Sequence, residues 1–134
     1  MAGYFTESNY ENAVLQLLNE ELGYNYIYGP DVERDYHSPL YEDVLLPSLQ
    51  RINKSLPMDA LTEAIYKLKN FETGTLLQKN MVFMDYLQNG VPVKYYDKGE
   101  ERSTLVYLVD FKNPASNEFT VAYQWTFIEN SEKR

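Results

Sequence analysis

The chain lacks cysteine altogether, and it has one histidine and one tryptophan among its 134 residues. Without cysteine there is no disulfide framework, no thiolate nucleophile and no zinc–thiolate site. No apolar run approaches the roughly 18 residues that a membrane-spanning helix needs, and the N-terminus lacks the basic and apolar regions of a signal peptide. The composition therefore predicts a protein of the cytoplasm.

Positive charge is also scarce. Twelve lysines and arginines face twenty aspartates and glutamates, which gives a net charge of −8. Surfaces that bind nucleic acid are usually basic, because neutralising phosphates dominates their affinity. We therefore expect the chain alone to bind DNA weakly. Lys67, Lys69 and Lys79 could form a local basic patch, but scattered surface lysines explain them more simply.

Several catalytic motifs are missing. Neither glycine-rich phosphate-binding pattern occurs, and no serine lies in a nucleophile elbow. His37 has no partner at the spacing of metal ligands, so we interpret it as a surface or capping residue beside Ser38. The chain offers no convergent polar constellation that would indicate a self-contained small-molecule enzyme.

The chain has enough apolar residues for one globular domain over residues 1–134. Hydrophobic residues make up 44% of the sequence and aromatic residues 15%, including 13 tyrosines. No linker or internal repeat divides it. Helical patterns come first and strand-like patterns last, an order typical of the α+β class.

Four helices are expected. The first begins at Ser8, which with Glu11 matches a capping box, and ends at Gly23. The others run from Ser38 through a kink at Pro47 to Ile52, from Pro57 to Leu68, and over residues 75–88. On the fourth helix, four apolar side chains at helical spacing should face the core: Leu77, Met81, Met84 and Leu87.

Four strands are expected, over residues 25–28, 91–97, 102–111 and 118–129. Residues 105–109 are apolar at every position, which predicts a central strand covered on both faces. The helices should pack on a three- to four-stranded, mainly antiparallel sheet. The last strand would leave a bare edge, which favours self-association through that terminal strand.

Two carboxylate patterns are candidates for chemistry. Glu11 could point into a cleft and help to hold a divalent cation, or it could simply complete the capping box. Asp110 and Lys112 imitate the acid-x-Lys half of a metal-dependent nuclease site, and Pro30 with Asp31 imitates the Pro-Asp half. We favour a structural explanation for this second pattern, in which Asp110 and Asn113 shape a turn.

An ordered set of segments resembles the start of the restriction (R) subunit of type I restriction-modification enzymes. The set covers nearly the whole chain: FTESNYE at 5–11, LGYNYIYG at 22–29, LKNF at 68–71, NMVFMDYL at 80–87, GVPV at 90–93, VYLVDFKNP at 106–114 and QWTFIEN at 124–130. Each piece is short, but their order is specific. Tyr123 departs from the pattern, where a more polar residue is expected before Gln124.

The resemblance implies an N-terminal nuclease domain of the PD-(D/E)xK class, followed by helicase-like translocase domains in a larger subunit. It implies Mg²⁺ and ATP as cofactors of that subunit, and DNA and the modification and specificity subunits as its partners. By position Glu11 matches the acidic residue of the family's first core helix, with Glu7 as its rival. The family's main catalytic residues lie beyond position 134, so the chain itself is expected to be a front portion that does not cut DNA.

A second interpretation comes from another class of protein. An acidic α+β domain could bind a protein partner through its exposed strand edge and have no catalytic role. The gene sequence that follows Arg134 distinguishes the two, because only the nuclease requires a Pro-Asp strand and a Glu-x-Lys strand there.

Overall fold

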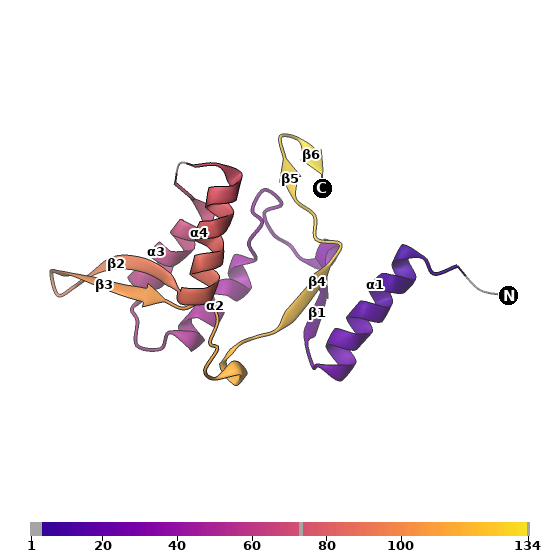
Figure 1. Cartoon of the computed structure of the whole chain (residues 1–134), viewed down its shortest axis with the longest axis horizontal. Coiled ribbons are helices and arrows are strands. Elements are labelled where there is room, and N and C mark those ends of the chain that lie inside the picture. Colours follow the sequence, from indigo (N-terminus) through magenta and orange to yellow (C-terminus); the bar gives the residue numbers. More distant parts are fainter. Residues whose placement is uncertain (1–3, 73, 134) are drawn as a thin grey trace. The chain divides into compact units, whose positions relative to one another are not determined.

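The computed structural model describes residues 4–72 and 74–133. Its contacts group into two compact units (Figure 1). The terminal unit consists of Met1–Pro39 and Glu118–Arg134, and the central unit consists of Leu40–Asn117. In chain order the central unit is thus inserted between the two segments of the terminal unit. The expectation of one domain over the whole chain stays a prediction.

Three helices build most of the central unit. They are α2 (Glu42–Ile52), α3 (Met58–Lys69) and α4 (Leu76–Asn89). Thr75 caps α4 through a complete capping box with Gln78, which satisfies two backbone donors that the helix itself cannot. The helix expected from Ser38 begins only at Glu42. The other two predicted helices are confirmed to within one residue at most of their bounds.

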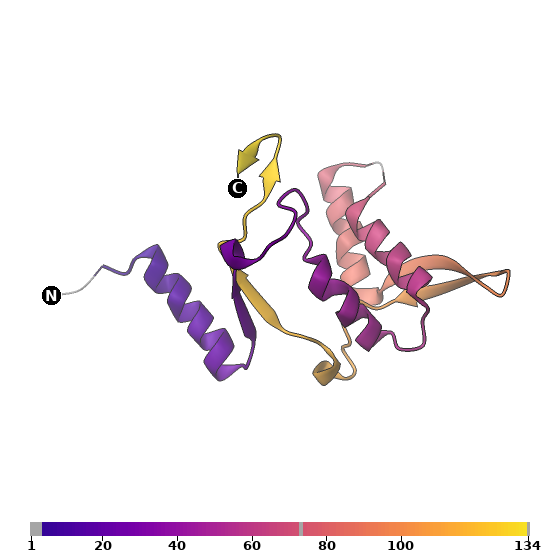
Figure 2. The same cartoon turned by 180° about the vertical axis from the view of Figure 1, so that it is seen from behind.

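The central unit also contains a long hairpin, formed by β2 (Val91–Asp97) and β3 (Glu100–Val106) (Figure 2). The strands are antiparallel, with Val91 opposite Val106 and Asp97 opposite Glu100. Lys98 and Gly99 form the two-residue connection, and both have positive φ angles of 51° and 80°. Paired positive φ angles match the twist of the strands, so the tight turn fixes the register.

The hydrophobic core lies in this unit. Among the described residues, every buried apolar side chain belongs to α2, α3 or the hairpin: Leu49, Ala60, Leu61, Ala64, Leu68, Val91, Val93 and Val106. Alternate residues of β2 face the core because side chains alternate across a strand. The two-sided central strand expected at 105–109 is wrong, since Leu105 and Tyr107 are 42% and 49% exposed.

A buried asparagine explains why the strand predicted at 102–111 ends early. β3 stops at Val106, and the amide of Asn53 then takes the place of a neighbouring strand. Asn53 Oδ1 accepts from the backbone N–H of Tyr107 at 2.8 Å, and Nδ2 donates to the Tyr107 carbonyl at 2.9 Å. The backbone groups of Tyr107 are therefore satisfied by a side chain, so the ladder does not continue.

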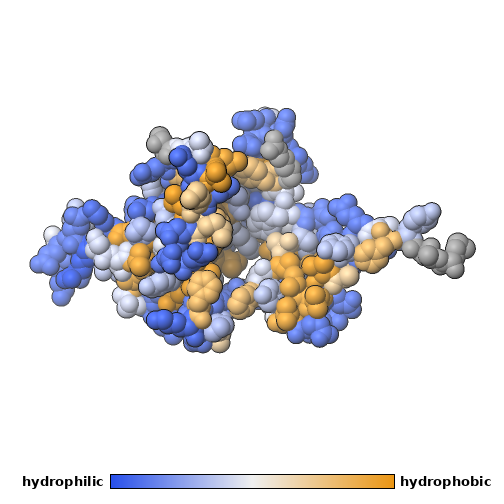
Figure 3. All heavy atoms as spheres, viewed as in Figure 1, coloured by the Kyte–Doolittle hydropathy of each residue, from blue (hydrophilic) through white to orange (hydrophobic). Residues whose placement is uncertain are grey.

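The prediction for the inward face of α4 is wrong for three of its four residues, whereas Leu87 is half-buried. Leu77, Met81 and Met84 are 70%, 65% and 50% exposed, whereas Phe83 and Tyr86 pack against the core. Both sets recur at helical spacing, and the aromatic pair buries more area for each residue. Apolar side chains consequently gather at the surface over α4, and a second group lies over the first helix (Figure 3).

The terminal unit begins with helix α1 (Glu7–Gln16), which continues as a π-helical turn, η1 (Leu17–Glu21). Strand β1 (Asn25–Tyr28) follows, then a 3₁₀ turn, η2 (Gly29–Asp31). Strand β4 (Thr120–Tyr123) pairs with β1 in parallel, with Tyr28 beside Tyr123. Two contacts between aromatic rings support the pairing of β1 with β4. The ring centres of Tyr24 and Phe119 are 5.0 Å apart, and those of Tyr28 and Tyr123 are 5.1 Å apart.

The strand predicted at 118–129 is broken. It divides into β4 and the short β5 (Ile128–Glu129), which pairs with β6 (Glu132–Lys133). The break lies at Gln124, whose φ of 55° is incompatible with an extended strand. The mixture of helices and strands agrees with the α+β class. The three- to four-stranded sheet is not found, because the described strands form three separate pairs, one of them parallel.

Candidate functional site

Two polar segments meet at the carboxyl ends of the parallel strands. Because β1 and β4 run in the same direction, the residues that follow them emerge at the same edge of the pair. Gly29, Pro30 and Asp31 follow β1, and Gln124 follows β4. In open α/β sheets, ligands bind outside the carboxyl ends of the strands. This edge is therefore a candidate binding site.

Glu11 reaches this edge from α1. Its carboxylate accepts from Nε2 of Gln124, with distances of 3.2 Å to Oε2 and 3.4 Å to Oε1. The two residues are 113 positions apart in the chain, so the fold alone brings them together. Glu11 is partly buried, whereas Glu7 lies exposed in the first turn of the same helix.

The capping explanation of Glu11 is wrong. Thr6, not Ser8, caps α1, and its hydroxyl accepts from the backbone N–H of Asn9 at 3.2 Å. Glu11 lies one turn further along the helix, where backbone donors already have carbonyl partners within the helix. Its carboxylate is therefore directed to Gln124 and is not used to cap the helix.

Gln124 has an unusual backbone. Its φ of 55° lies in the left-handed region, which side chains other than glycine, asparagine and aspartate seldom adopt. Its carbonyl group lies close to Gly29. A Cβ atom on Gly29 would lie 2.9 Å from the carbonyl carbon and closer still to the oxygen. Glycine at the end of β1 therefore makes room for the turn at the end of β4.

Arg34 holds the segment after Gln124. Its guanidinium lies 3.8 Å from the centre of the Trp125 ring, and it donates hydrogen bonds to the carbonyls of Thr126 and Ser38. A stacked guanidinium with several donors fixes both partners at once. Sequence reasoning missed Arg34, and no pattern in the sequence links position 34 to position 125.

The other candidates have structural roles or lie on the surface. The carboxylate of Asp110 accepts from the backbone N–H groups of Lys112 at 3.0 Å and Asn113 at 2.9 Å, which is the turn favoured above. Asp31 is exposed in η2. His37 contacts Asp35 at 3.2 Å, and both side chains are 70% exposed.

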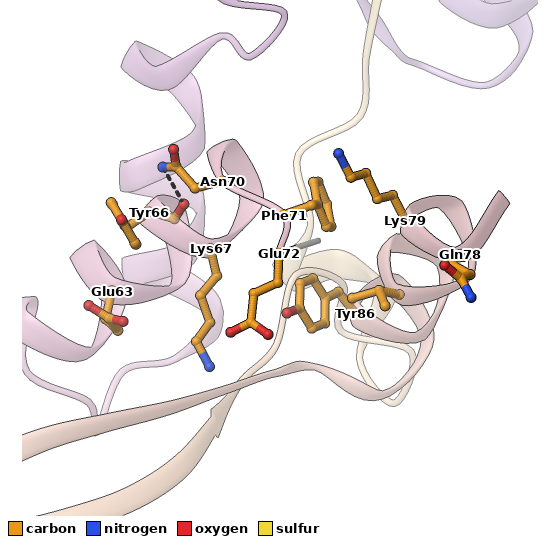
Figure 4. Close-up of a pocket in the computed structure, with 10 residues that line it drawn as sticks. Glu63, Tyr66, Lys67, Asn70, Phe71, Glu72, Gln78, Lys79 and Tyr86 are labelled. Atoms are coloured by element: carbon orange, nitrogen blue, oxygen red, sulfur yellow. Dashed lines mark hydrogen bonds between the residues drawn. The ribbon is translucent and has the colours of Figure 1, made fainter. Parts of the chain in front are cut away.

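The lysines of the expected basic patch are largely paired. Lys69 forms an ion pair with Glu42 at 2.6 Å, and Lys67 donates to the carbonyl of Pro92 at 2.5 Å. Lys67 and Lys79 also line a cavity of about 520 Å³ between α3 and α4, together with the acidic Glu63 and Glu72 (Figure 4). With two charges of each sign, this lining gives no net attraction for phosphate.

Tyr86 lines the same cavity. Burial raises the pKa of its hydroxyl above the usual value, and the carboxylates of Glu72 and Asp85 raise it further. Its ring belongs to the aromatic cluster with Phe71 and Phe83. We find no chemistry that this arrangement favours.

Glu11 fits a divalent cation as one ligand. A carboxylate is the hard oxygen donor that Mg²⁺ prefers, and Nε2 of Gln124 lies 3.2 Å and 3.4 Å from its two oxygens. Across residues 4–72 and 74–133, no three acidic or histidine side chains come together as a possible metal site. Further ligands would have to come from outside the described residues. Within the same part of the chain, no helix is long and apolar enough to span a membrane.

Comparison with known proteins identifies the family. Residues 4–134 match the model of the type I restriction enzyme R protein N terminus. The chain is 29% identical over 126 residues to the type I restriction enzyme HindI endonuclease subunit of Haemophilus influenzae. It is 30% identical over 121 residues to a putative type I restriction enzyme MjaIXP endonuclease subunit of Methanocaldococcus jannaschii.

These alignments cover most of this chain but little of each relative. They include 88% and 86% of the chain, and 12% of each relative's length. No solved structure matches the chain significantly. Because the family match extends over almost every residue, the chain belongs to the family of type I restriction enzyme R protein N termini.

Proposed function

We propose that the chain is the N-terminal part of the nuclease domain in the DNA-cleaving, ATP-dependent subunit of a type I restriction enzyme. The family and the names of the relatives support this proposal. In this proposal Glu11 is the acidic residue of the first helix in a PD-(D/E)xK nuclease. The subunit acts in the cytoplasm on DNA, together with modification and specificity subunits.

One observation carries the assignment of Glu11. Its carboxylate lies against Gln124 at the carboxyl ends of two parallel strands, and it is not used to cap its own helix. A carboxylate there can join other acidic side chains, from strands added beside this pair, in holding one cation. When bound, Mg²⁺ would activate water and stabilise the charge that develops on phosphate. The role of this chain is to orient one ligand for that cation.

The terminal unit itself favours such added strands. Parallel strands normally lie in sheets that are covered on both faces, whereas this pair leaves Tyr26, Tyr28 and Phe119 55%, 40% and 43% exposed. Further strands and helices of a nuclease domain would cover these rings. The chain alone supplies one ligand, so we expect it to leave plasmid DNA intact in the presence of Mg²⁺.

The test uses the full-length subunit assembled with its partners on unmodified plasmid DNA. Glu11→Gln should reduce cleavage by at least about 100-fold, because it removes a charged ligand, while ATP hydrolysis stays unchanged. Glu20→Gln is the matched control, since Glu20 also accepts from a glutamine amide, that of Gln16, on the same helical segment. Cleavage lost in Glu7→Gln and kept in Glu11→Gln would transfer the assignment to Glu7.

The second candidate function is that of a protein-interaction module without catalysis. The outward apolar face of α4, with Leu77 70% and Met81 65% exposed, favours it. Normal cleavage in both glutamate variants would support this alternative. So would a gene that lacks a Pro-Asp strand and a Glu-x-Lys strand after position 134.

A further inference from the structure

We propose that Gln124 is a positioning residue that holds the carboxylate of Glu11 in the orientation needed to bind a cation. The inference rests on the proposed function of Glu11 and adds a second residue to it. Gln124 would not touch DNA or the cation itself. It would act by fixing which oxygen lone pairs of Glu11 remain free.

The contact geometry supports this role. A single amide group, Nε2 of Gln124, lies 3.2 Å and 3.4 Å from the two oxygens of Glu11. An N–H donor to a charged acceptor forms a stronger hydrogen bond than one between neutral groups. At these distances from both oxygens the amide lies in the fork of the carboxylate. A cation would then be bound through the outer lone pairs of the two oxygens. Ligands in metal sites commonly depend on such outer partners for their orientation.

The backbone is built around this contact. Gln124 lies in the left-handed region, and the absence of a side chain on Gly29 accommodates its carbonyl. An extended backbone at position 124 would continue β4 toward β5 as one strand. Backbone conformations that are seldom populated concentrate at functional sites, where the surrounding structure enforces them. Here Arg34 enforces it, by stacking on Trp125 and binding the carbonyl of Thr126.

Two substitutions separate the side chain from the backbone. Gln124→Gly removes the amide but suits the positive φ, so the fold should be kept or slightly stabilised. Gln124→Asn tolerates the same φ and keeps an amide on a shorter side chain. If Gln124 only stabilised the turn, replacing it by glycine would leave cleavage unchanged. If it positions Glu11, the same replacement reduces cleavage although the fold is kept.

The first measurement is cleavage by the assembled full-length enzyme over a range of Mg²⁺ concentrations. For Gln124→Gly we expect the half-saturating Mg²⁺ concentration to rise about 10-fold or more, with ATP hydrolysis unchanged. Gln124→Asn should recover part of the loss. Wild-type Mg²⁺ dependence in Gln124→Gly would overturn the proposal. Its thermal unfolding, recorded on the 134-residue chain, must stay at or above the wild-type midpoint for the loss to count as positioning.

The second measurement needs no activity. In the 134-residue chain, the side-chain N–H₂ signals of Gln124 should shift in NMR spectra on Glu11→Gln and stay in place on Glu20→Gln. Gln124 side-chain signals that do not shift on Glu11→Gln would contradict the contact between the two side chains. Loss of cleavage in Glu11→Gln with normal cleavage in Gln124→Gly would refute only this inference. Normal cleavage in Glu11→Gln would refute the proposed function and, with it, the role of Gln124.

Discussion

The carbonyl group of Gln124 fills the space that a side chain on Gly29 would need. The two residues directly follow the two parallel strands, so their contact fixes how closely the strand ends approach. It also sets the direction in which the chain leaves β4. The position of the Gln124 amide beside Glu11 depends on this close approach.

Gly29→Ala is therefore expected to destabilise the terminal unit. The added methyl group would collide with backbone atoms, which cannot rotate away, and we expect a loss of about 1–3 kcal/mol. Urea unfolding followed by the fluorescence of Trp125, the only tryptophan, measures it. Gly23→Ala in the same unit is the control for the contact: its φ of 73° strains an alanine, but the open space around it means that no neighbouring atom is displaced. The Gln124 amide signals should move in Gly29→Ala and stay in Gly23→Ala; unchanged signals in both would contradict the contact.

The sequence predicted local structure well where local chemistry decides it. The strands expected at 25–28 and 91–97 and the helix expected over 75–88 are confirmed, because neighbouring residues decide them. The capping box expected at Ser8 is not found, since Thr6 caps α1. The resemblance also assigned the family correctly from the order of short segments.

Pairings between distant residues were not predictable in the same way. The period of the apolar residues on α4 fits two faces, and only the packing of Phe83 and Tyr86 selects one. The strand expected beyond Val106 ends because Asn53, more than fifty positions earlier, binds the backbone of Tyr107. Glu11 was a candidate from the sequence, whereas its partner Gln124 and the clamp by Arg34 depend on contacts that no local pattern contains.

Asn53→Leu should be among the most destabilising single substitutions in the central unit. Asn53 is 6% exposed, and its amide satisfies the N–H and the carbonyl of Tyr107. A leucine of similar size would leave both groups without a partner, at about 1–3 kcal/mol for each. Asn70→Leu is the matched control, since Asn70 is exposed and donates only to the carbonyl of Tyr66. Equal free energies of unfolding for the two variants would contradict this account.

Arg34→Lys should weaken the terminal unit although it keeps the charge. Lysine cannot stack flat on Trp125 while it donates to the carbonyls of Thr126 and Ser38, so we expect a loss of about 1–2 kcal/mol. The emission of Trp125 should change in the folded protein. Arg102→Lys is the control, because Arg102 is 51% exposed in ion pairs with Asp97 and Glu100. That variant should change the free energy of unfolding by about 0.5 kcal/mol or less.

The last strands favour self-association, and the fold shows how to test this prediction. β1 and β4 form a sheet of only two strands. Each strand therefore has one edge that pairs with no other strand of that sheet. Such edges bind other chains, and the exposed rings beside them, Tyr26 and Phe119, add apolar area. We expect the 134-residue chain to form dimers at tens of micromolar in sedimentation velocity.

Ala122→Lys places a charge on the exposed edge strand and should shift the chain to monomer. Met81→Lys on α4 is the control, since its side chain is 65% exposed in the central unit. Dissociation by Met81→Lys alone would assign the interface to α4, and a monomeric wild-type chain at these concentrations would show that the edge of β4 does not pair.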